Sequence, residues 1–386
     1  MSEKRSLRVA FCAPLVGLGG GETSLLGLMG ALRRRGHRPV LVCPSEGRLT
    51  EAARNSGLEV VVERFGYPPR VGGLWVPSPA QAEAMLRLLR KMRPDLVHVN
   101  DFRPCIHLCL AARPLRLPVV WTVHGPWQST NILSKQAARR LCDRALAVSE
   151  FVAASLRRAS AVPEDRLRVV PLGVDTGRFS PAKGRIGVWR PWGISDDHKI
   201  VISLVRFQKV KGLDLMLEVA RLLLRQRPNV RLAMVGDYLT GDEEERQYGA
   251  RISAAIEADP VLRAGVVRIP FQEKPEDLLA SAHVYLCTSE VESFGQAVVE
   301  AMGCGLPAAV TDCGGPTETV VDGETGLIVR SGQPEDLAEA VARLLEDEPL
   351  RRSLGERARQ RALDAYSLPR YADKVEEQYL EILKPT

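Results

Sequence analysis

The sequence predicts an α/β protein that contains two doubly wound, Rossmann-like domains. Short apolar segments rich in Val, Leu and Ile alternate with longer amphipathic segments along the chain. The alternation runs in two series, and an aperiodic stretch rich in Gly, Pro and Trp separates them. Strands that are apolar throughout, each followed by a helix, indicate a parallel sheet that is covered on both faces. The length of 386 residues allows two or three domains of ordinary size.

The first series predicts a first domain over residues 1–178. Its predicted strands are 7–13, 39–43, 58–62, 95–99, 118–123, 144–148 and 167–170. Its predicted helices are 22–35, 79–92, 134–141 and 149–159. The segment 63–79 is rich in Gly and Pro, and it is predicted to be a long loop of the kind that often carries specificity.

The second series predicts a second domain over residues 190–367. Its predicted strands are 199–205, 230–235, 265–269, 283–287, 307–310 and 326–329. Its predicted helices are 211–226, 243–258, 294–304 and 334–346. The aperiodic stretch from about 173 to 198 is predicted to be a linker. Open parallel sheets bind ligands at the carboxyl ends of their strands, so two facing domains are expected to form a cleft lined by the loops after strands.

Composition excludes several classes of protein. Apolar residues make up 45% and charged residues 26% of the chain, which is ordinary for a globular protein and wrong for a disordered or fibrous one. No apolar run approaches the ~18 residues of a membrane-spanning helix. Arg8 interrupts the first apolar stretch, which favours a strand over a secretion signal. The eight cysteines are scattered without a Cys-x-x-Cys pair, which predicts reduced, buried thiols of a cytoplasmic protein and no zinc site.

Positive charge is concentrated in the first half of the chain. Residues 1–178 hold 27 Lys and Arg against 14 Asp and Glu, a net charge of +13. Residues 179–386 hold 26 against 33, a net charge of −7. A division of this size indicates an interaction surface on the first half, for nucleic acid, an anionic membrane or a phosphorylated molecule. A solvated surface is the alternative.

The most informative segment comes directly after the fourth predicted strand of the second domain. Ser293 followed by Gln296 has the spacing of a capping box, which predicts a helix start near Phe294 whose N–H groups can hold a diphosphate. Glu292 would lie just before this helix, and Glu300 would lie ~10 Å along it. Carboxylates at that separation can hold opposite ends of an elongated ligand. Glu300 is suited to the hydroxyl groups of a ribose, and Glu292 is suited to a sugar. Two solvated glutamates at a helix end are the alternative.

A second cluster follows the first strand of the second domain and contains Arg206, Lys211 and Gly212. Cations beside a helix N-terminus oppose the helix dipole unless an anion lies between them. The cluster therefore indicates a phosphate site, and a solvated charged loop is the alternative. The chain contains no Asp-x-Asp pair to hold a metal ion, so cations and N–H groups are expected to meet the charge of a departing diphosphate.

Further candidates follow other predicted strands. Gly19 and Gly20 lie in a glycine-rich loop that lets a backbone approach a ligand closely, but no acidic residue ends the second strand as nicotinamide binding requires. His124 follows strand 118–123, on the edge that faces the predicted cleft, although a lone histidine is more often structural. Gly236 forms a further turn on the same edge of the second domain.

In their order along the chain, these motifs resemble the retaining glycosyltransferases of family 4, which have the GT-B fold. The resemblance covers nearly the whole chain, at residues 19–22, 35–37, 123–125, 170–175, 206 with 211–212, 292–300 and 322–326. One such motif is weak, whereas the ordered set is specific. Gln296 departs from the family pattern, because an apolar residue is commoner there, and this departure bears on donor contacts.

The resemblance implies transfer of a sugar from a UDP- or GDP-linked donor to a hydroxyl acceptor, with retention and without a metal or cofactor. Arg206 and Lys211 would bind the diphosphate, and His124 would contact sugar or acceptor. Glu300 and Glu292 would hold the ribose and the donor sugar. Further donor contacts would come from Gly19, Gly20, Gly236, Phe271, Ser293, Phe294, Gly295 and Gln296. The family also implies that a C-terminal helix within 368–386 packs back on the first domain.

Two other functions are compatible with the same sequence. A nucleotide-sugar 2-epimerase of the same fold would convert the donor without an acceptor. A nucleic-acid-binding protein would use the basic half, but that half has no aromatic-interleaved stripe or recognisable module. Our hypothesis for the basic half is peripheral contact with an anionic membrane that bears a lipid-linked acceptor, at its inner face and in the synthesis of cell-envelope polysaccharide or glycolipid.

Overall fold

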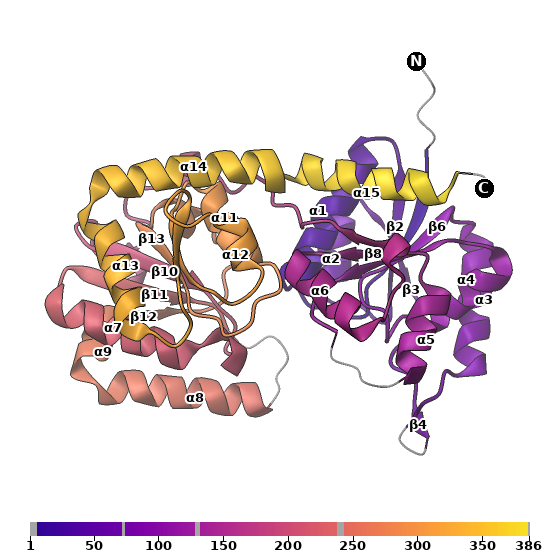
Figure 1. Cartoon of the computed structure of the whole chain (residues 1–386), viewed down its shortest axis with the longest axis horizontal. Coiled ribbons are helices and arrows are strands. Elements are labelled where there is room, and N and C mark those ends of the chain that lie inside the picture. The colour runs from indigo at the N-terminus through magenta and orange to yellow at the C-terminus, as the bar shows by residue number, and fades with distance from the viewer. Residues whose placement is uncertain (1–5, 72–73, 128–131, 238–242, 385–386) are drawn as a thin grey trace. The chain divides into compact units, whose positions relative to one another are not determined.

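Two parallel sheets, one in each unit of the chain, organise the structure (Figure 1). The structure is a computed structural model, and it describes residues 6–71, 74–127, 132–237 and 243–384. The first unit comprises Met1–Gly173 with Leu368–Thr386, and the second comprises Val174–Ser367. The first unit ends at Gly173, whereas the predicted first domain ends at residue 178. The Val174 N–H donates to Tyr366 O at 2.8 Å, and both residues belong to the second unit.

The main sheet described in the first unit is parallel and has the strand order β3-β2-β1-β6-β7-β8-β9. The bounds are β1 Arg8–Cys12, β2 Arg38–Cys43, β3 Glu59–Val62, β6 Leu96–Val99, β7 Val119–Val123, β8 Arg144–Ala147 and β9 Leu167–Val169. Each coincides with a predicted strand to within one residue at either end. Every residue of β6, β7 and β8 is buried, and these strands are apolar except for His98, Thr122 and Arg144, one in each strand. The predicted loop 63–79 contains a short antiparallel pair, β4 Arg70–Val71 and β5 Leu74–Trp75.

Helices follow most strands of the first unit. Their bounds are α1 Gly20–Arg34, α2 Arg48–Asn55, α3 Pro79–Met92, α4 Ile106–Ala112, α5 Ile132–Leu141 and α6 Glu150–Ala159. No pattern predicted α2 and α4, because eight and seven residues show barely two turns of periodicity. The first turn of α1 also differs from the prediction, since Gly20 belongs to the helix rather than to the preceding loop.

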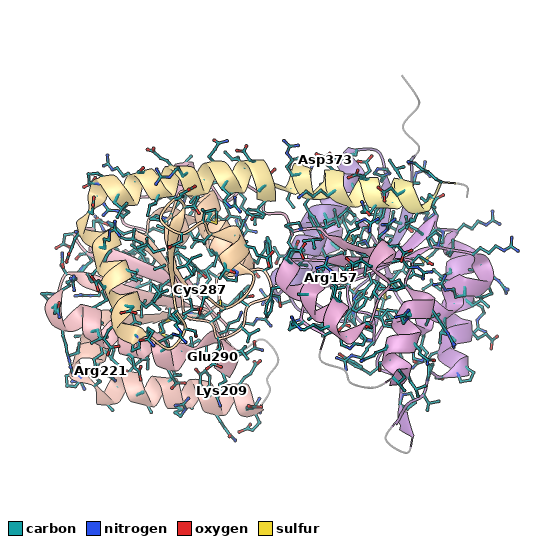
Figure 2. All side chains as sticks on the ribbon, viewed as in Figure 1. Arg157, Lys209, Arg221, Cys287, Glu290 and Asp373 are labelled. Atoms are coloured by element: carbon teal, nitrogen blue, oxygen red, sulfur yellow. The ribbon has the colours of Figure 1, made fainter. Side chains whose placement is uncertain are left out.

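The C-terminal helix α15, Leu368–Ile382, packs on the first unit although it comes last in the sequence. Arg35 at the end of α1 pairs with Asp373 at 2.8 Å and with Glu376 at 2.9 Å (Asp373 is labelled in Figure 2). On the buried side of α15, the Tyr379 hydroxyl contacts the His98 ring of β6. Burial lowers the pKa of His98 to about 3, so this ring is neutral. Helix α15 is thus joined to α1 by ion pairs and to the first sheet by a buried polar contact.

The sheet of the second unit is also parallel, with the order β12-β11-β10-β13-β14-β15. The strand bounds are β10 Lys199–Leu204, β11 Val230–Val235, β12 Val266–Ile269, β13 Val284–Cys287, β14 Ala308–Thr311 and β15 Gly326–Val329. The helix bounds are α7 Leu213–Gln226, α8 Glu243–Ala258, α9 Pro260–Gly265, α10 Glu276–Ala280, α11 Gln296–Gly303, α12 Pro316–Thr319, α13 Pro334–Glu346 and α14 Glu348–Tyr366. The apolar faces of α7 and α13 pack on one side of this sheet and form its core.

The stretch that was predicted to be a linker belongs to the second unit from Val174 onward and packs on it. Trp189 is buried, and its indole N–H donates to Ser281 O at 3.2 Å. Arg178 pairs with Glu276 at the start of α10 at 2.9 Å. The Gly, Pro and Trp residues that broke the periodicity here are therefore part of a packed, irregular segment.

Two further features bear on the expected class of protein. All eight cysteines are buried and unbridged, as predicted from their scattered positions. Within the described ranges, none of the helices combines the length and apolar character needed to cross a bilayer.

Candidate active site

The strand order reverses at the first strand of each sheet, and parallel sheets bind ligands at such points. In the second unit, β11 and β12 lie on one side of β10, whereas β13, β14 and β15 lie on the other. The loops after β10 and β13 therefore lie at the point of the sheet where such proteins bind ligands. The Glu290 N–H donates to Val210 O at 2.9 Å and joins these two loops (Glu290 is labelled in Figure 2).

The two loops bring Lys211 and Glu292 into direct contact. The Lys211 ammonium donates to a Glu292 carboxylate oxygen, and the side chains are 17% and 21% exposed. Backbone hydrogen bonds of 2.8 Å, to Cys313 O and from the Gly315 N–H, fix Glu292 against the loop after β14. Two residues that sequence patterns placed in separate clusters thus form one partly buried ion pair. Low exposure to solvent strengthens the attraction between the two charges of such a pair.

Backbone contacts that only glycine permits hold the loops of this edge together. A Cβ on Gly236 would lie 1.8 Å from Val205 O, and one on Gly212 would lie 2.0 Å from Thr288 O. Both glycines have positive φ, 147° and 62°. A Cβ on Gly315 would lie 2.4 Å from Ser293 O. The loops after β10, β11, β13 and β14 therefore pack backbone against backbone and form a closely packed platform.

The capping box predicted at Ser293 and Gln296 is wrong. Helix α11 begins at Gln296, after Gly295 in the left-handed region with φ 84°, and no side chain caps it. The N-cap position is occupied by Gly295 and not by Ser293. The Gln296 amide instead donates to Glu300 Oε1 at 3.5 Å. Phe294 is buried against Tyr366, with ring centroids 5.8 Å apart, so the helix start is anchored while its first N–H groups lack intrahelical partners.

Glu300 lies on α11 with 9% of its surface exposed. Burial raises the pKa of its carboxyl from 4.5 to about 7, and the Gln296 amide and Arg178 oppose this rise only in part. A carboxyl in this environment is poorly solvated as an anion. Hydroxyl groups of a ligand would supply the hydrogen bonds that the anion lacks.

We expect Glu300→Gln to stabilise the unliganded protein above pH 7. Below pH 4.5 the carboxyl is protonated in both the folded and the unfolded chain, so its contribution to stability is intact. As the pH rises from 4.5 to about 7, the unfolded chain ionises first and stability is lost; above pH 7 the loss stays constant. Urea unfolding should therefore show little difference between variants at pH 4.5 and a gain of about 3 kcal/mol at pH 8. A difference independent of pH would contradict this assignment.

The remaining predicted residues of the second unit lie around this platform. Arg206 is exposed, and its guanidinium makes no hydrogen bond or ion pair within the described ranges. The Gly236 N–H donates to Ile269 O at 2.9 Å, which brings the turn after β11 next to the end of β12. Phe271, two residues further, is 38% exposed. A cation and an aromatic ring thus stand in solvent at the same edge of the sheet.

In the first unit, His124 meets a residue that sequence patterns missed. His124 follows β7 and Asn100 follows β6, and His124 Nε2 lies 2.7 Å from Asn100 Oδ1. Because an amide oxygen only accepts, this contact places the ring proton on Nε2 and leaves Nδ1 as an acceptor. Burial lowers the pKa of His124 to about 4, so the ring is neutral at pH 7. The available signal for Asn100 was a polar residue directly after strand 95–99.

The glycine-rich turn lies against the same histidine. A Cβ on Gly21 would lie 3.5 Å from the His124 ring, so the start of α1 contacts this side chain. The Gly19 N–H is occupied, since it donates to the Glu22 carboxylate at 3.1 Å. Gly20 is the first residue of α1. The carboxyl edge of the first sheet therefore combines a neutral imidazole, an amide and a helix N-terminus.

Both halves of the chain match known protein families, and the two matches cover the segments that carry these motifs. Residues 18–178 match the family described as Glycosyltransferase Family 4, and residues 190–361 match the family described as Glycosyl transferases group 1.

Two relatives and one solved structure illustrate the similarity. N-acetyl-alpha-D-glucosaminyl L-malate synthase of Bacillus anthracis is 29% identical over 97% of this chain and 96% of its own length. The GDP-mannose-dependent alpha-(1-6)-phosphatidylinositol monomannoside mannosyltransferase of Mycolicibacterium smegmatis is 30% identical over 81% and 82%. The crystal structure of Anabaena HepE in complex with UDP and glucose has a TM-score of 0.82 and 22% identity, covering 96% of this chain and 99% of that one.

Proposed function

Because this chain belongs to the glycosyltransferases of family 4 and has the GT-B fold, we propose that it transfers a sugar with retention from a UDP- or GDP-linked donor to a hydroxyl acceptor. The observation that carries the proposal is the Lys211–Glu292 pair at the point where the second sheet reverses. It places a cation and a carboxylate side by side, as the diphosphate and the sugar of such a donor require. Exposed Arg206 lies on the same loop as Lys211.

The cations, the start of α11 and the two glutamates have separate roles in the proposed reaction. Arg206, Lys211 and the first N–H groups of α11 stabilise the charge that develops on the departing diphosphate. Glu292 orients the donor sugar, and Glu300 accepts hydrogen bonds from the ribose hydroxyls. The acceptor attacks from the face that the diphosphate leaves, and a phosphate oxygen takes its proton, which yields retention without a protein nucleophile. These cations make the proposed reaction independent of a metal ion.

His124 is assigned the contact to the sugar or the acceptor. Its Nδ1 is an acceptor when Nε2 donates to Asn100, so it suits a hydroxyl donor. Since its pKa is lowered to about 4, this contact does not titrate between pH 6 and 9. Asn100 acts on the reaction only by holding this tautomer and is therefore a positioning residue.

We infer a cytoplasmic enzyme that contacts the inner face of an anionic membrane and uses a lipid-linked acceptor in cell-envelope polysaccharide or glycolipid synthesis. The net charge of +13 on residues 1–178 supports membrane contact. The name of the M. smegmatis relative, which acts on a phosphatidylinositol mannoside, supports a lipid-linked acceptor.

A panel of UDP-, GDP- and ADP-sugars tests the donor. We expect one nucleotide sugar to raise the melting temperature, because a ligand that binds only the folded protein stabilises it. The same sugar should be transferred to an acceptor with its anomeric configuration unchanged, as read by proton NMR. Glu300→Gln should weaken this binding while it stabilises the free protein. Conversion of the donor alone to its 2-epimer would contradict transfer, and an inverted product would contradict retention.

A further inference from the structure

A basic pocket lies at the amino edge of the sheet in the first unit. It is open to solvent and has a volume of about 780 Å³. The starts of β1 and β2 and the end of α3 contribute its charged side chains, which are Arg8, Arg38, Arg90, Lys91, Arg93 and Asp95. Because β1 has five residues, this edge is about 16 Å from the carboxyl edge that carries His124. The pocket is therefore separate from the candidate active site.

Five cations line this pocket and only one carboxylate does. Asp95 accepts a hydrogen bond from the Arg8 backbone N–H at 2.7 Å, and Glu59 pairs with the Arg8 guanidinium at 2.8 Å. The Arg8 Nε is nevertheless buried without a hydrogen-bond partner in the described part of the chain. The four cations contributed by β2 and α3 form no ion pair there either. These four cations are exposed, and a bound anion would reduce their mutual repulsion.

Compensation of the α3 dipole does not explain this arrangement. Cations in the last turn of a helix are favourable, which accounts for Arg90 and Lys91. Arg8 and Arg38, however, begin strands. Arg93 ends α3 in the left-handed region with φ 48°, where glycine is the favoured residue. From this left-handed position Arg93 places its guanidinium at the pocket.

We propose that this pocket binds an anionic phosphate group. Guanidinium groups from three different elements can each give paired hydrogen bonds to phosphate oxygens. The phosphate belongs either to a soluble phosphorylated molecule or to a lipid headgroup. The proposal stands independently of the proposed sugar transfer, because it uses none of the residues of the candidate active site.

Calorimetric titration with inorganic pyrophosphate at low salt tests the site. It is made on the full chain and on the Arg206→Ala/Lys211→Ala variant, which lacks the donor-side cations. In both backgrounds we expect Arg38→Ala and Arg93→Gly to weaken binding about tenfold each. Arg116→Gly is the matched control, since Arg116 is also exposed and left-handed, with φ 54°, but lies outside the pocket. Circular dichroism melting confirms that each variant is folded.

Flotation with phosphatidylglycerol and phosphatidylcholine vesicles identifies the source of the phosphate. Pyrophosphate binding that is lost in Arg93→Gly but kept in Arg116→Gly supports a soluble ligand. Binding to phosphatidylglycerol vesicles alone, with the same dependence on Arg93, supports a lipid headgroup. Binding of neither probe overturns the proposal. Equal loss of binding in Arg93→Gly and Arg116→Gly also overturns it, because the general positive charge of the surface would then explain the binding.

Discussion

Replacing Lys211 with alanine is expected to lower kcat/KM for sugar transfer by about 10²- to 10³-fold. The side chain is only 17% exposed and contacts Glu292, so its charge acts in a poorly solvated place. Such a cation stabilises charge that grows on the diphosphate as the sugar leaves, and it should therefore affect kcat more than KM. Steady-state kinetics with a saturating acceptor measures both constants.

Lys209→Ala is the matched control for this substitution. Lys209 lies two residues earlier on the same loop, exposed to solvent (Figure 2). We expect its removal to change kcat/KM less than about twofold, because exposed charges interact weakly. Glu292→Gln combined with Lys211→Ala should lose less than the two single effects added together, since the side chains form one unit. Equal losses in the Lys209 and Lys211 variants would show that only net charge matters.

Gly236→Ala is expected to destabilise the second unit by about 3 kcal/mol or more. Its Cβ would lie 1.8 Å from Val205 O, and that oxygen belongs to a backbone that cannot move without displacing the loop after β10. The φ of 147° adds strain for any residue with a side chain. Urea unfolding monitored by tryptophan fluorescence measures the change, because Trp189 is buried in this unit.

Gly323→Ala separates the two causes of the expected loss of stability in Gly236→Ala, which are the close contact with Val205 O and the backbone strain. Gly323 also has a positive φ, 70°, but no atom lies within 4 Å of its Cβ position. We expect a cost of about 1 kcal/mol there, from the backbone alone. Equal costs at both positions would show that the close approach to Val205 contributes nothing. A Gly236 variant that keeps its stability but loses donor binding would instead show that the loops yield and the site deforms.

The strands could be predicted closely from the sequence, and the irregular parts could not. Buried parallel strands are largely apolar, so β6, β7 and β8 are visible as short apolar segments, although each contains one polar residue (His98, Thr122 and Arg144). The start of α11 was misplaced because the Ser293 and Gln296 pattern imitates a capping box, whereas the left-handed Gly295 begins the helix. The sequence predicts a linker around Trp189, where the structure has a packed segment, because packing in irregular structure leaves no periodic pattern.

The candidate site also has some features that the sequence predicts and others that only the tertiary structure shows. The residue types themselves made Glu292, Glu300, Arg206, Lys211 and His124 candidates, since charged and polar side chains after apolar strands are visible in a linear pattern. Only the tertiary structure paired Lys211 with Glu292, raised the pKa of Glu300 and placed Asn100 against His124. Contacts, burial and proton affinity depend on neighbours that are distant along the chain. The sequence therefore determined which groups are available, and the packing of the loops decided which of them act together.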